Sequence, residues 1–214
     1  TIATGSVNIL EAVKRHSPRS KVFLSGSGLQ FKNVGKPINE RDELDANSAY
    51  SMARIQSLYA ARYFRTLGVK AYFGSFFNHD SPRRGQRHVT QMIASAVKRI
   101  EQGSNEKIEI GNFDVRKEWG FSGDIVRGIW TFVNQDEVFE CVIGTGKDYS
   151  IKDWLQVCFG LINAKWEDYV VQNHSFIPDY YVLVSDPGTL RALGWVPEVD
   201  FNGLAKIMLS DAQH

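Results

Sequence analysis

The segment SAYSMARIQ, residues 48–56, holds a tyrosine and an arginine four positions apart. On a helix, Tyr50 and Arg54 would share one face, where a cation can prepare a phenol for proton transfer. Lysine is the usual residue for that task. Ser27 follows an apolar run earlier in the chain, and its hydroxyl could help to polarise an alcohol or carbonyl. Spacing alone favours a plainer interpretation, in which Ser27 satisfies a turn and Tyr50 packs at the start of a helix.

A second candidate site lies in FFNHDSPRRG, residues 76–85. Asn78 and His79 follow an apolar run, and Arg83 and Arg84 supply two guanidinium groups. The planar guanidinium group of arginine matches the geometry of phosphate oxygens. Binding residues also often lie in a loop that follows a buried strand. A solvated polar loop explains the same residues equally well, so both interpretations stay open.

A third candidate is DVRKEWG, residues 114–120, which sets Arg116 and Lys117 beside Trp119. Two cations and an aromatic ring suit a nucleotide diphosphate and its base. A charged turn held by one buried tryptophan fits these residues too, and without further information it is the simpler interpretation. The pair Gly26 and Gly28 is a weak phosphate-loop signal, because no third glycine and no helix start follow it.

Alternating helical and strand-like segments must position these residues. The first part of the chain predicts helix 3–14, strand 21–26, helix 49–67 and strand 69–77. This order indicates an α/β fold with parallel strand pairing.

The later part predicts a smaller lobe with strands that cross back to the first part. We expect a Rossmann-like portion over residues 1–82, and over residues 83–214 a lobe that binds mainly substrate and returns some segments to the sheet. The expected elements of this later part are helix 89–102, strand 107–112, helix 122–133, strand 138–144, helix 151–163 and a final helix 202–213.

The composition limits the possible functions. The chain has 214 residues, 43% of them hydrophobic, with 23% charged residues and a formal net charge of +1. The sequence has no basic stripe that would indicate nucleic-acid binding. It also has no polybasic block or long apolar run that would indicate a membrane partner. Cys141 and Cys158 form neither a disulfide framework nor a metal-ligand set, and the histidines lack metal-ligand spacing. We expect a cytoplasmic protein without a metal site.

The chain opens directly within a predicted helix. A nucleotide-binding α/β domain begins with a strand, a glycine-rich turn and a helix. We therefore expect that the glycine-rich first half of such a domain is absent from this chain.

Together these segments resemble the extended short-chain dehydrogenase/reductases, and among them the GDP-mannose 4,6-dehydratases. The resemblance runs nearly end to end. Its most specific part is FFNHDSPRRG followed by VTQMI; the others are GSVNILEAVK, FLSGSGLQF, SAYSMAR, GNFDVRKEWGFSGDIVRGIW and SDPGTLRALGWVPEVDFNGL. It implies a modified Rossmann fold, a doubly wound parallel sheet whose N-terminal part this chain lacks, with a small α+β substrate lobe.

The resemblance also implies a reaction at a sugar. The family oxidises the sugar at C4 with NADP or NAD, eliminates water across C5–C6 and returns the hydride to C6. By position, Ser27 would bind the C4 oxygen and Tyr50 would be its base. Arg54 would stand in for the family's lysine beside the nicotinamide ribose.

Binding roles follow from the same resemblance. His79 and Arg84 would contact the cofactor, as would Tyr50 and Arg54. The residues expected near the nucleotide sugar, besides Ser27, are Asn78, Val89 and Lys117.

Several positions depart from the family pattern. Arginine replaces lysine at Arg54, and Leu29 stands where the dehydratases place the glutamate that handles the C5 proton. Met92 occupies the position of a phosphate-facing lysine, and residues 176–181 hold no arginine where the family has a nucleotide-gripping one. The loss of the glutamate argues against dehydration in particular.

Three functions stay open on the sequence. The first is a nucleotide-sugar oxidoreductase or lyase resembling GDP-mannose 4,6-dehydratase but altered in activity, using NADP or NAD and favouring a GDP-hexose. The second is a nucleotide-sugar 4-epimerase or 4-ketoreductase. The third is a non-catalytic homologue that binds a nucleotide sugar or a partner enzyme. We also expect a homo-oligomer, with helices 49–67 and 89–102 as its candidate interface.

Overall fold

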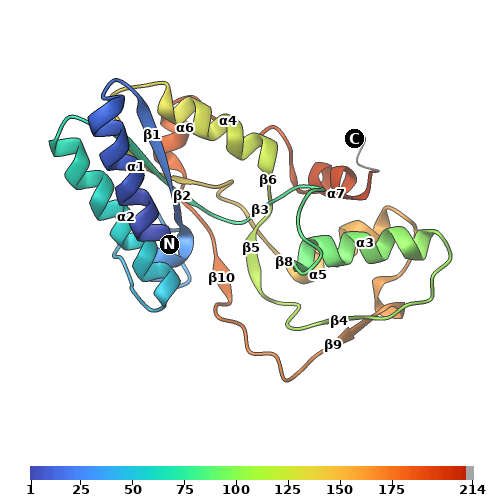
Figure 1. Cartoon of the computed structure of the whole chain (residues 1–214). Coiled ribbons are helices and arrows are strands. Elements are labelled where there is room, and N and C mark those ends of the chain that lie inside the picture. The colour runs from blue at the N-terminus through green and yellow to red at the C-terminus, as the bar shows by residue number, and fades with distance from the viewer. Residues whose placement is uncertain (211–214) are drawn as a thin grey trace.

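The computed structural model describes residues 1–210 and contains a parallel sheet at one end and a helical lobe at the other (Figure 1). The sheet has the order β1-β2-β7, formed by β1 (Lys21–Ser27), β2 (Lys70–Phe76) and β7 (Glu140–Ile143). Both pairings are parallel, and Ser27 at the end of β1 lies opposite Phe76 at the end of β2. The carboxyl ends of these strands therefore meet at one edge of the sheet.

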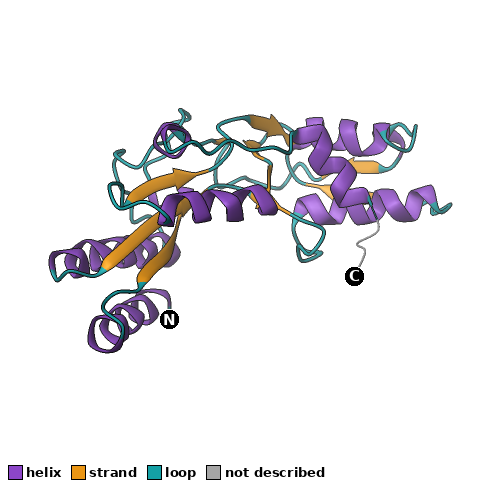
Figure 2. Cartoon of the chain, turned by 90° about the horizontal axis from the view of Figure 1, so that it is seen from above, coloured by secondary structure: helices purple, strands orange, loops and turns teal. Residues whose placement is uncertain are grey.

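Helices α1 (Ile2–His16) and α2 (Ala49–Thr66) cover one face of the sheet. Leu10, Leu58 and Phe64 from these helices pack with Val22 and Leu24 of β1 in one buried cluster. Figure 2 shows the two helices together beside the strands. This packing fixes α2 against β1, so the residues of its first turns lie near the end of that strand.

Helices α4 (Ser122–Val133) and α6 (Gly188–Ala192) supply a second cluster against the same sheet. Ile125 and Phe132 of α4 and Leu190 of α6 pack with Tyr72 and Ile143 of the sheet. Segments late in the chain thus pack against the sheet.

Local sequence explains where α2 begins and ends. The Ser48 hydroxyl accepts a hydrogen bond from the Ser51 amide at 3.1 Å, and the Ser51 hydroxyl accepts one from the Ser48 amide at 3.0 Å. This capping box satisfies two amides that a helix start leaves free, which is worth about 1 kcal/mol. Gly68, at φ +86°, follows the last turn in the left-handed region that glycine adopts without strain. Tyr50 is thereby placed in the first turn.

The lobe is a helical layer with short strands. Its core contains Trp119 and Trp154, and its helices are α3 (Val89–Glu101), α5 (Ile151–Gly160) and α7 (Phe201–Leu209). The short elements of the whole described chain, of which η1 lies at the sheet, are η1 (Gly28–Gln30), β3 (His79–Asp80), β4 (Ile108–Ile110), β5 (Arg116–Glu118), β6 (Gly120–Phe121), β8 (Asp148–Ser150), η2 (Trp166–Asp168), β9 (Val170–Gln172) and β10 (Val182–Leu183).

Four pairings of short strands tie the described part of the chain together. β4 pairs with β9, β5 lies between β8 and β10, and β3 pairs with β6. The last pairing joins the segment after β2 to the segment before α4.

Most predicted elements are confirmed, with shifted ends. Strand 107–112 shortens to Ile108–Ile110, and helix 151–163 ends at Gly160. The final helix runs from Phe201 to Leu209, and the part of its prediction that falls on residues 211–214 lies outside the described residues. The expectation that no helix start follows Gly28 is wrong, since the 3₁₀ turn η1 begins there with Ser27 as its cap.

Candidate active site

A cavity of about 480 Å³ lies where β1 and β2 end. We call it the sheet cavity. Its lining residues are Gly26, Ser27, Leu29, Tyr50, Arg54, Phe76, Phe77, Asn78, His79, Arg84, His88, Tyr180 and Leu183. Six of the eight predicted site residues are among them, which the parallel strand ends and the position of α2 explain.

Ser27 is held firmly but keeps a free donor. Its hydroxyl oxygen accepts from the Leu29 amide at 3.2 Å, and its own amide donates to the Gln30 side chain at 3.1 Å. The hydroxyl hydrogen remains available to a ligand in the cavity. Gly28 serves close packing here, because a Cβ at that position would lie 2.9 Å from the Phe77 ring.

Tyr50 and Arg54 lie together at the side of the cavity. Tyr50 is 40% exposed, and the Arg54 guanidinium carbon lies 5.1 Å from the centre of the Tyr50 ring. Arg54 Nη1 donates to the Ser25 carbonyl at 2.6 Å and to the Ser25 hydroxyl at 2.9 Å. Arg54 Nε is buried without a hydrogen-bond partner among the described residues. Arg54 therefore holds the end of β1 through Nη1, while its Nε–H donor remains unused beside the cavity.

His79 and Arg84 form the opposite side. His79 Nδ1 lies 2.8 Å from the Phe77 carbonyl, which favours a proton on Nδ1 and leaves Nε2 as an acceptor. Arg84 lies 3.3 Å from the Asp80 carboxylate and 3.2 Å from His88 Nδ1. Asp80 is 4% exposed; burial raises the pKa of its carboxyl group, which Arg84 opposes.

The sheet cavity is lined by hydroxyl, amide, imidazole and guanidinium groups, with apolar rings and side chains. Leu29 is 41% exposed and lines it. Among residues 1–210, no aspartate or glutamate belongs to its lining. The cavity thus offers proton donors and cations but no carboxylate base.

Val89 and Lys117, the other two predicted site residues, line a neighbouring cavity of about 350 Å³ in the lobe, which we call the lobe cavity. Its remaining lining residues are Arg87, Met92, Glu109, Ile110, Gly111, Asn112, Val115, Ile151, Phe176, Pro178, Asp179 and Tyr180. Tyr180 lines both cavities. The predicted site residues are therefore divided between two spaces with a shared wall.

Lys117 is a half-buried cation in the lobe cavity. Its ammonium lies 5.0 Å from the centre of the Trp119 ring. Burial lowers the pKa of the Lys117 amine, while the Asp80 carboxylate acts in the opposite direction. A half-buried, weakly compensated ammonium is stabilised by a ligand anion, because the anion replaces part of the solvation that the protein removes.

Sequence reasoning missed several lining residues. Arg87 adds a cation to the lobe cavity, and His88 and Leu183 line the sheet cavity. Tyr180 comes from an irregular segment that carries no periodic signal. Arg87 and His88 lie within three residues of the end of the NHDSPRRG motif, so their proximity to it is the one signal that could have pointed to them.

Within the part of the chain that the structure describes, no group of three or more His, Cys, Asp or Glu side chains is arranged to hold a metal ion. No helix in that part combines the length and apolar character that crossing a membrane requires.

Comparison with known proteins shows clear similarity. The family described as GDP-mannose 4,6 dehydratase matches residues 1–208. The chain is 32% identical over 218 aligned residues to GDP-mannose 4,6 dehydratase 2 of Arabidopsis thaliana, an alignment that covers 98% of this chain and 58% of that protein. It is 27% identical to GDP-mannose 4,6-dehydratase of Yersinia enterocolitica, over 99% of this chain and 66% of that one. The chain thus spans about three fifths of the length of the first of these relatives.

Solved structures share the fold. RMD from Pseudomonas aeruginosa, complexed with NADPH, superposes with a TM-score of 0.88 at 19% identity, covering 96% of this chain and 71% of that one. UDP-glucose 4-epimerase from Thermus thermophilus, complexed with NAD, gives a TM-score of 0.77 at 18% identity, covering 96% and 67%. The predicted α/β fold of Rossmann type is confirmed.

Proposed function

The chain belongs to the GDP-mannose 4,6-dehydratase family, and from this premise we propose that it is an NAD(P)-dependent nucleotide-sugar oxidoreductase that exchanges hydride at C4 without eliminating water. The observation that carries the proposal is the sheet cavity, which holds Ser27 and Tyr50 but no carboxylate in its described lining. Reduction of a 4-keto sugar, or epimerisation at C4, needs only these hydroxyls and the cofactor. We favour the reductase or epimerase over the dehydratase for this reason.

The proton chemistry assigns one role to each hydroxyl. The Tyr50 phenol gives a proton to the C4 oxygen in reduction and takes it back in oxidation. Ser27 orients the same oxygen with its free hydroxyl hydrogen, since its lone pairs already accept from the Leu29 amide. Arg54 holds positive charge beside the Tyr50 ring, which favours negative charge on the phenol oxygen during transfer.

The sheet cavity fits the cofactor. Arg54 Nε is buried in its wall without a hydrogen-bond partner in the described chain, so a polar ligand group would relieve that cost. Arg54, His79 and Arg84 would hold NAD(P) there, as cations and polar groups around a polyanion. When bound, NAD(P) donates or accepts the hydride.

The lobe cavity fits the nucleotide part of the substrate. Lys117 and Arg87 supply positive charge for a diphosphate, and Asp179 and Glu109 can accept hydrogen bonds from a base or sugar. The names of the relatives favour a GDP-linked hexose. Val89 and Asn78 would lie on either side of the junction marked by Tyr180.

Leu29 is the residue that disfavours dehydration. Elimination across C5–C6 requires a group that removes the C5 proton, and an alkyl side chain cannot do so. Among the described lining residues His79 and His88 are weak bases. His88 Nδ1 faces an Arg84 donor, and His79 keeps Nε2 as an acceptor, but neither histidine takes the position of the family's glutamate, where Leu29 stands. A non-catalytic nucleotide-sugar binder is the remaining alternative, and it predicts ligand binding without turnover.

The test is a product assay on the purified protein. We expect oxidation of NADPH or NADH with a GDP-linked 4-keto-6-deoxyhexose, or epimerisation of a GDP-hexose, and no loss of water from GDP-mannose by mass spectrometry. A dehydrated product from GDP-mannose would overturn the assignment. Binding of cofactor and sugar nucleotide without any product would favour the non-catalytic homologue.

We also propose that the protein is a homo-oligomer through α1 and α2. Val7 and Ile9 on α1, and Tyr59 and Tyr63 on α2, are between 40% and 59% exposed. The predicted contribution of helix 89–102 is not supported, because the apolar side chains of α3 pack inside the chain against α5 and α7. Sedimentation of wild type and Ile9→Glu tests this, and a monomeric wild type would refute it.

A further inference from the structure

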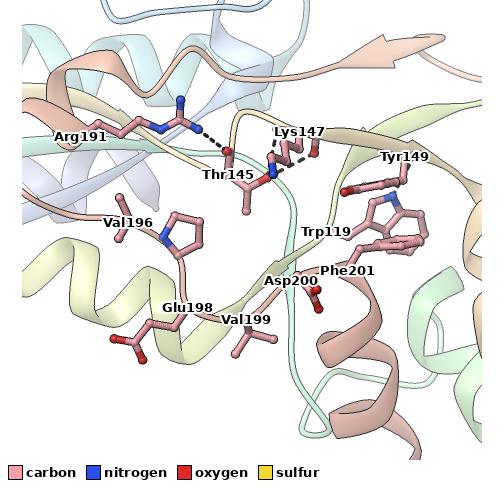
Figure 3. A pocket seen from close by; sticks show the side chains of 11 residues that line it. Trp119, Thr145, Lys147, Tyr149, Arg191, Val196, Glu198, Val199, Asp200 and Phe201 are labelled. Carbon is pink, nitrogen blue, oxygen red and sulfur yellow. Dashed lines mark hydrogen bonds between the residues drawn. The ribbon is translucent and has the colours of Figure 1, made fainter.

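A third cavity lies apart from the two described above and has a volume of about 300 Å³. The loop after β7, helix α6 and the segment that leads into α7 line it (Figure 3). We call it the loop cavity. Neither Ser27 and Tyr50 nor Lys117 belongs to its lining. Its size is at the lower end of the range for small-molecule sites, about 300 Å³ upward.

One end of the loop cavity is aromatic and apolar. The Tyr149 and Phe201 rings are stacked 4.0 Å apart at 8°, and Trp119 packs edge-on to Phe201 at 5.9 Å. Val196 adds aliphatic surface and is 59% exposed. Figure 3 shows the three rings gathered together, with Val196 across the cavity from them. A flat apolar ring can therefore lie between the aromatic cluster on one side and Val196 on the other.

Two cations lie on the opposite side of the loop cavity from Phe201. Arg191 Nη2 donates a hydrogen bond to the Thr145 carbonyl at 2.8 Å, and the other N–H groups of the guanidinium remain available to a ligand. The Lys147 ammonium has no hydrogen bond or ion pair within residues 1–210 and is exposed. Figure 3 shows both side chains flanking Thr145.

The acidic residues of the loop cavity are already engaged. Glu198 pairs with Arg127 at 2.5 Å, and Asp200 accepts from the Gly203 amide at 2.7 Å as the cap of α7. Asp200 keeps its negative charge, because an amide is neutral, so the two cations Lys147 and Arg191 exceed the carboxylates without a cation partner in the described lining by one.

We propose that the loop cavity binds a small anion, a carboxylate or phosphate, carried on a flat apolar ring. The anion lies between Lys147 and Arg191, and the ring lies against Phe201 and Val196. Charge-assisted hydrogen bonds to Lys and Arg are stronger than neutral ones, and the aromatic end adds apolar contact.

The loop that carries Lys147 is set in place before any ligand arrives. Glu118 is fully buried, and its carboxylate accepts from the amides of Thr145, Gly146 and Ser185 and from the Ser185 hydroxyl. Burial raises the pKa of the Glu118 carboxyl, and these hydrogen bonds oppose the rise. Because the loop is already fixed, ligand binding costs less conformational entropy of the protein.

Three consecutive residues of one segment connect the loop cavity to the lobe cavity. Lys117 lines the lobe cavity, Glu118 fixes the loop, and Trp119 lines the loop cavity. Since the Lys117 ammonium lies 5.0 Å from the Trp119 ring centre, an occupant that shifts this ring changes the surroundings of Lys117. We therefore expect coupling between the two cavities; this part rests on the proposed function, which places the nucleotide at Lys117.

The binding test uses 2-naphthoate as the probe and isothermal titration calorimetry. Wild type should bind it, and the uncharged analogue 2-naphthylmethanol should bind at least about tenfold more weakly, as expected for a lost charge-assisted hydrogen bond. Lys147→Gln should weaken naphthoate binding by a similar factor. Lys14→Gln, an exposed lysine on α1, is the matched control and should change nothing. Absence of binding, equal binding of the alcohol, or an unaffected Lys147→Gln variant would overturn the site.

The coupling test measures the affinity for GDP with and without saturating naphthoate. A several-fold change that disappears in Lys147→Gln supports coupling, because linkage must be reciprocal between two binding sites. GDP binding that is insensitive to naphthoate refutes the coupling. Failure of GDP to bind at all would count against the proposed function, and the naphthoate titration would still decide the loop cavity independently.

Discussion

The sheet cavity and the lobe cavity share Tyr180 but differ in charge. The sheet cavity presents Arg54 and Arg84 with no carboxylate in its described lining, whereas the lobe cavity mixes Lys117 with the acids Glu109 and Asp179. A space with cations alone suits a polyanionic cofactor. A space with both signs suits a ligand that must be recognised by donors and acceptors together. Under the proposed function, we expect the hydride chemistry in the first cavity and substrate selection in the second.

Removal of the Tyr50 hydroxyl would test this contrast most severely. Tyr50→Phe keeps the ring beside Arg54 but loses the proton donor, so we expect kcat to fall about 10³-fold with cofactor binding retained. Steady-state kinetics and a cofactor titration measure both quantities. Tyr59→Phe, an exposed tyrosine on the same helix, should leave kcat unchanged. A Tyr50→Phe variant within tenfold of wild type would show that the sheet cavity does not perform the chemistry.

Loss of the Lys117 charge should affect binding and leave chemistry intact. We expect Lys117→Gln to raise KM for the sugar nucleotide about tenfold with little change in kcat, the pattern of a ground-state phosphate contact. A comparable fall in kcat would contradict the separation of the two cavities.

The pH dependence of that binding follows from burial. Burial lowers the pKa of Lys117 from the usual 10.5, so its charge, and with it nucleotide affinity, is lost as pH rises through that lowered value. GDP titrations across alkaline pH should show this fall in wild type. Lys117→Arg stays charged and should show a flatter profile, and a profile identical to wild type would exclude Lys117 as the responsible group.

Arg54→Lys should have a modest effect, and it separates two roles of Arg54: its positive charge beside Tyr50 and its hydrogen bonds to Ser25. Lysine keeps the positive charge but cannot reproduce both contacts of Nη1 with the Ser25 carbonyl and hydroxyl. We expect the free energy of unfolding to fall by about 1 kcal/mol, which corresponds to a Tm lower by roughly 2–4 °C. Turnover should stay within about threefold of wild type. Calorimetry and kinetics measure the two effects, and Arg54→Gln serves as the uncharged comparison. Abolished turnover in Arg54→Lys would mean that the guanidinium fork itself is required.

The smallest effect concerns the missing carboxylate. Leu29→Glu places an acid in the sheet cavity, so we expect a trace of dehydrated product from GDP-mannose, about 1% of the main turnover or less, because its geometry is untuned. Leu29→Gln should yield none. Mass spectrometry decides between them, and equal product from both variants would show that the carboxylate is not what limits elimination.

The sequence predicts the sheet end better than the lobe. The helices and strands around Tyr50 and Ser27 follow from apolar periodicity, a serine cap and Gly68, all of which act locally. The short strands of the lobe, such as β5 and β8, hold two or three residues and exist only through pairings between distant segments. No local pattern encodes such a pairing, which is why these strands were not predicted.

The candidate site shows the same division. Parallel strand ends bring Ser27 and Asn78 to one cavity, as the strand order predicts. Tyr180 arrives from an irregular segment, and the separation of Lys117 from Ser27 depends on how the lobe packs. Residue roles carried over from the family resemblance remain predictions that the variants above test.

The shared wall at Tyr180 has a consequence for the binding of the two ligands. Tyr180 is half-buried, burial raises the pKa of its phenol, and its side chain lines both cavities. Whichever ligand arrives first covers one side of this ring and completes the surface that the second ligand meets. We therefore expect each ligand to raise the affinity for the other by the same factor, since linkage between two binding sites is reciprocal.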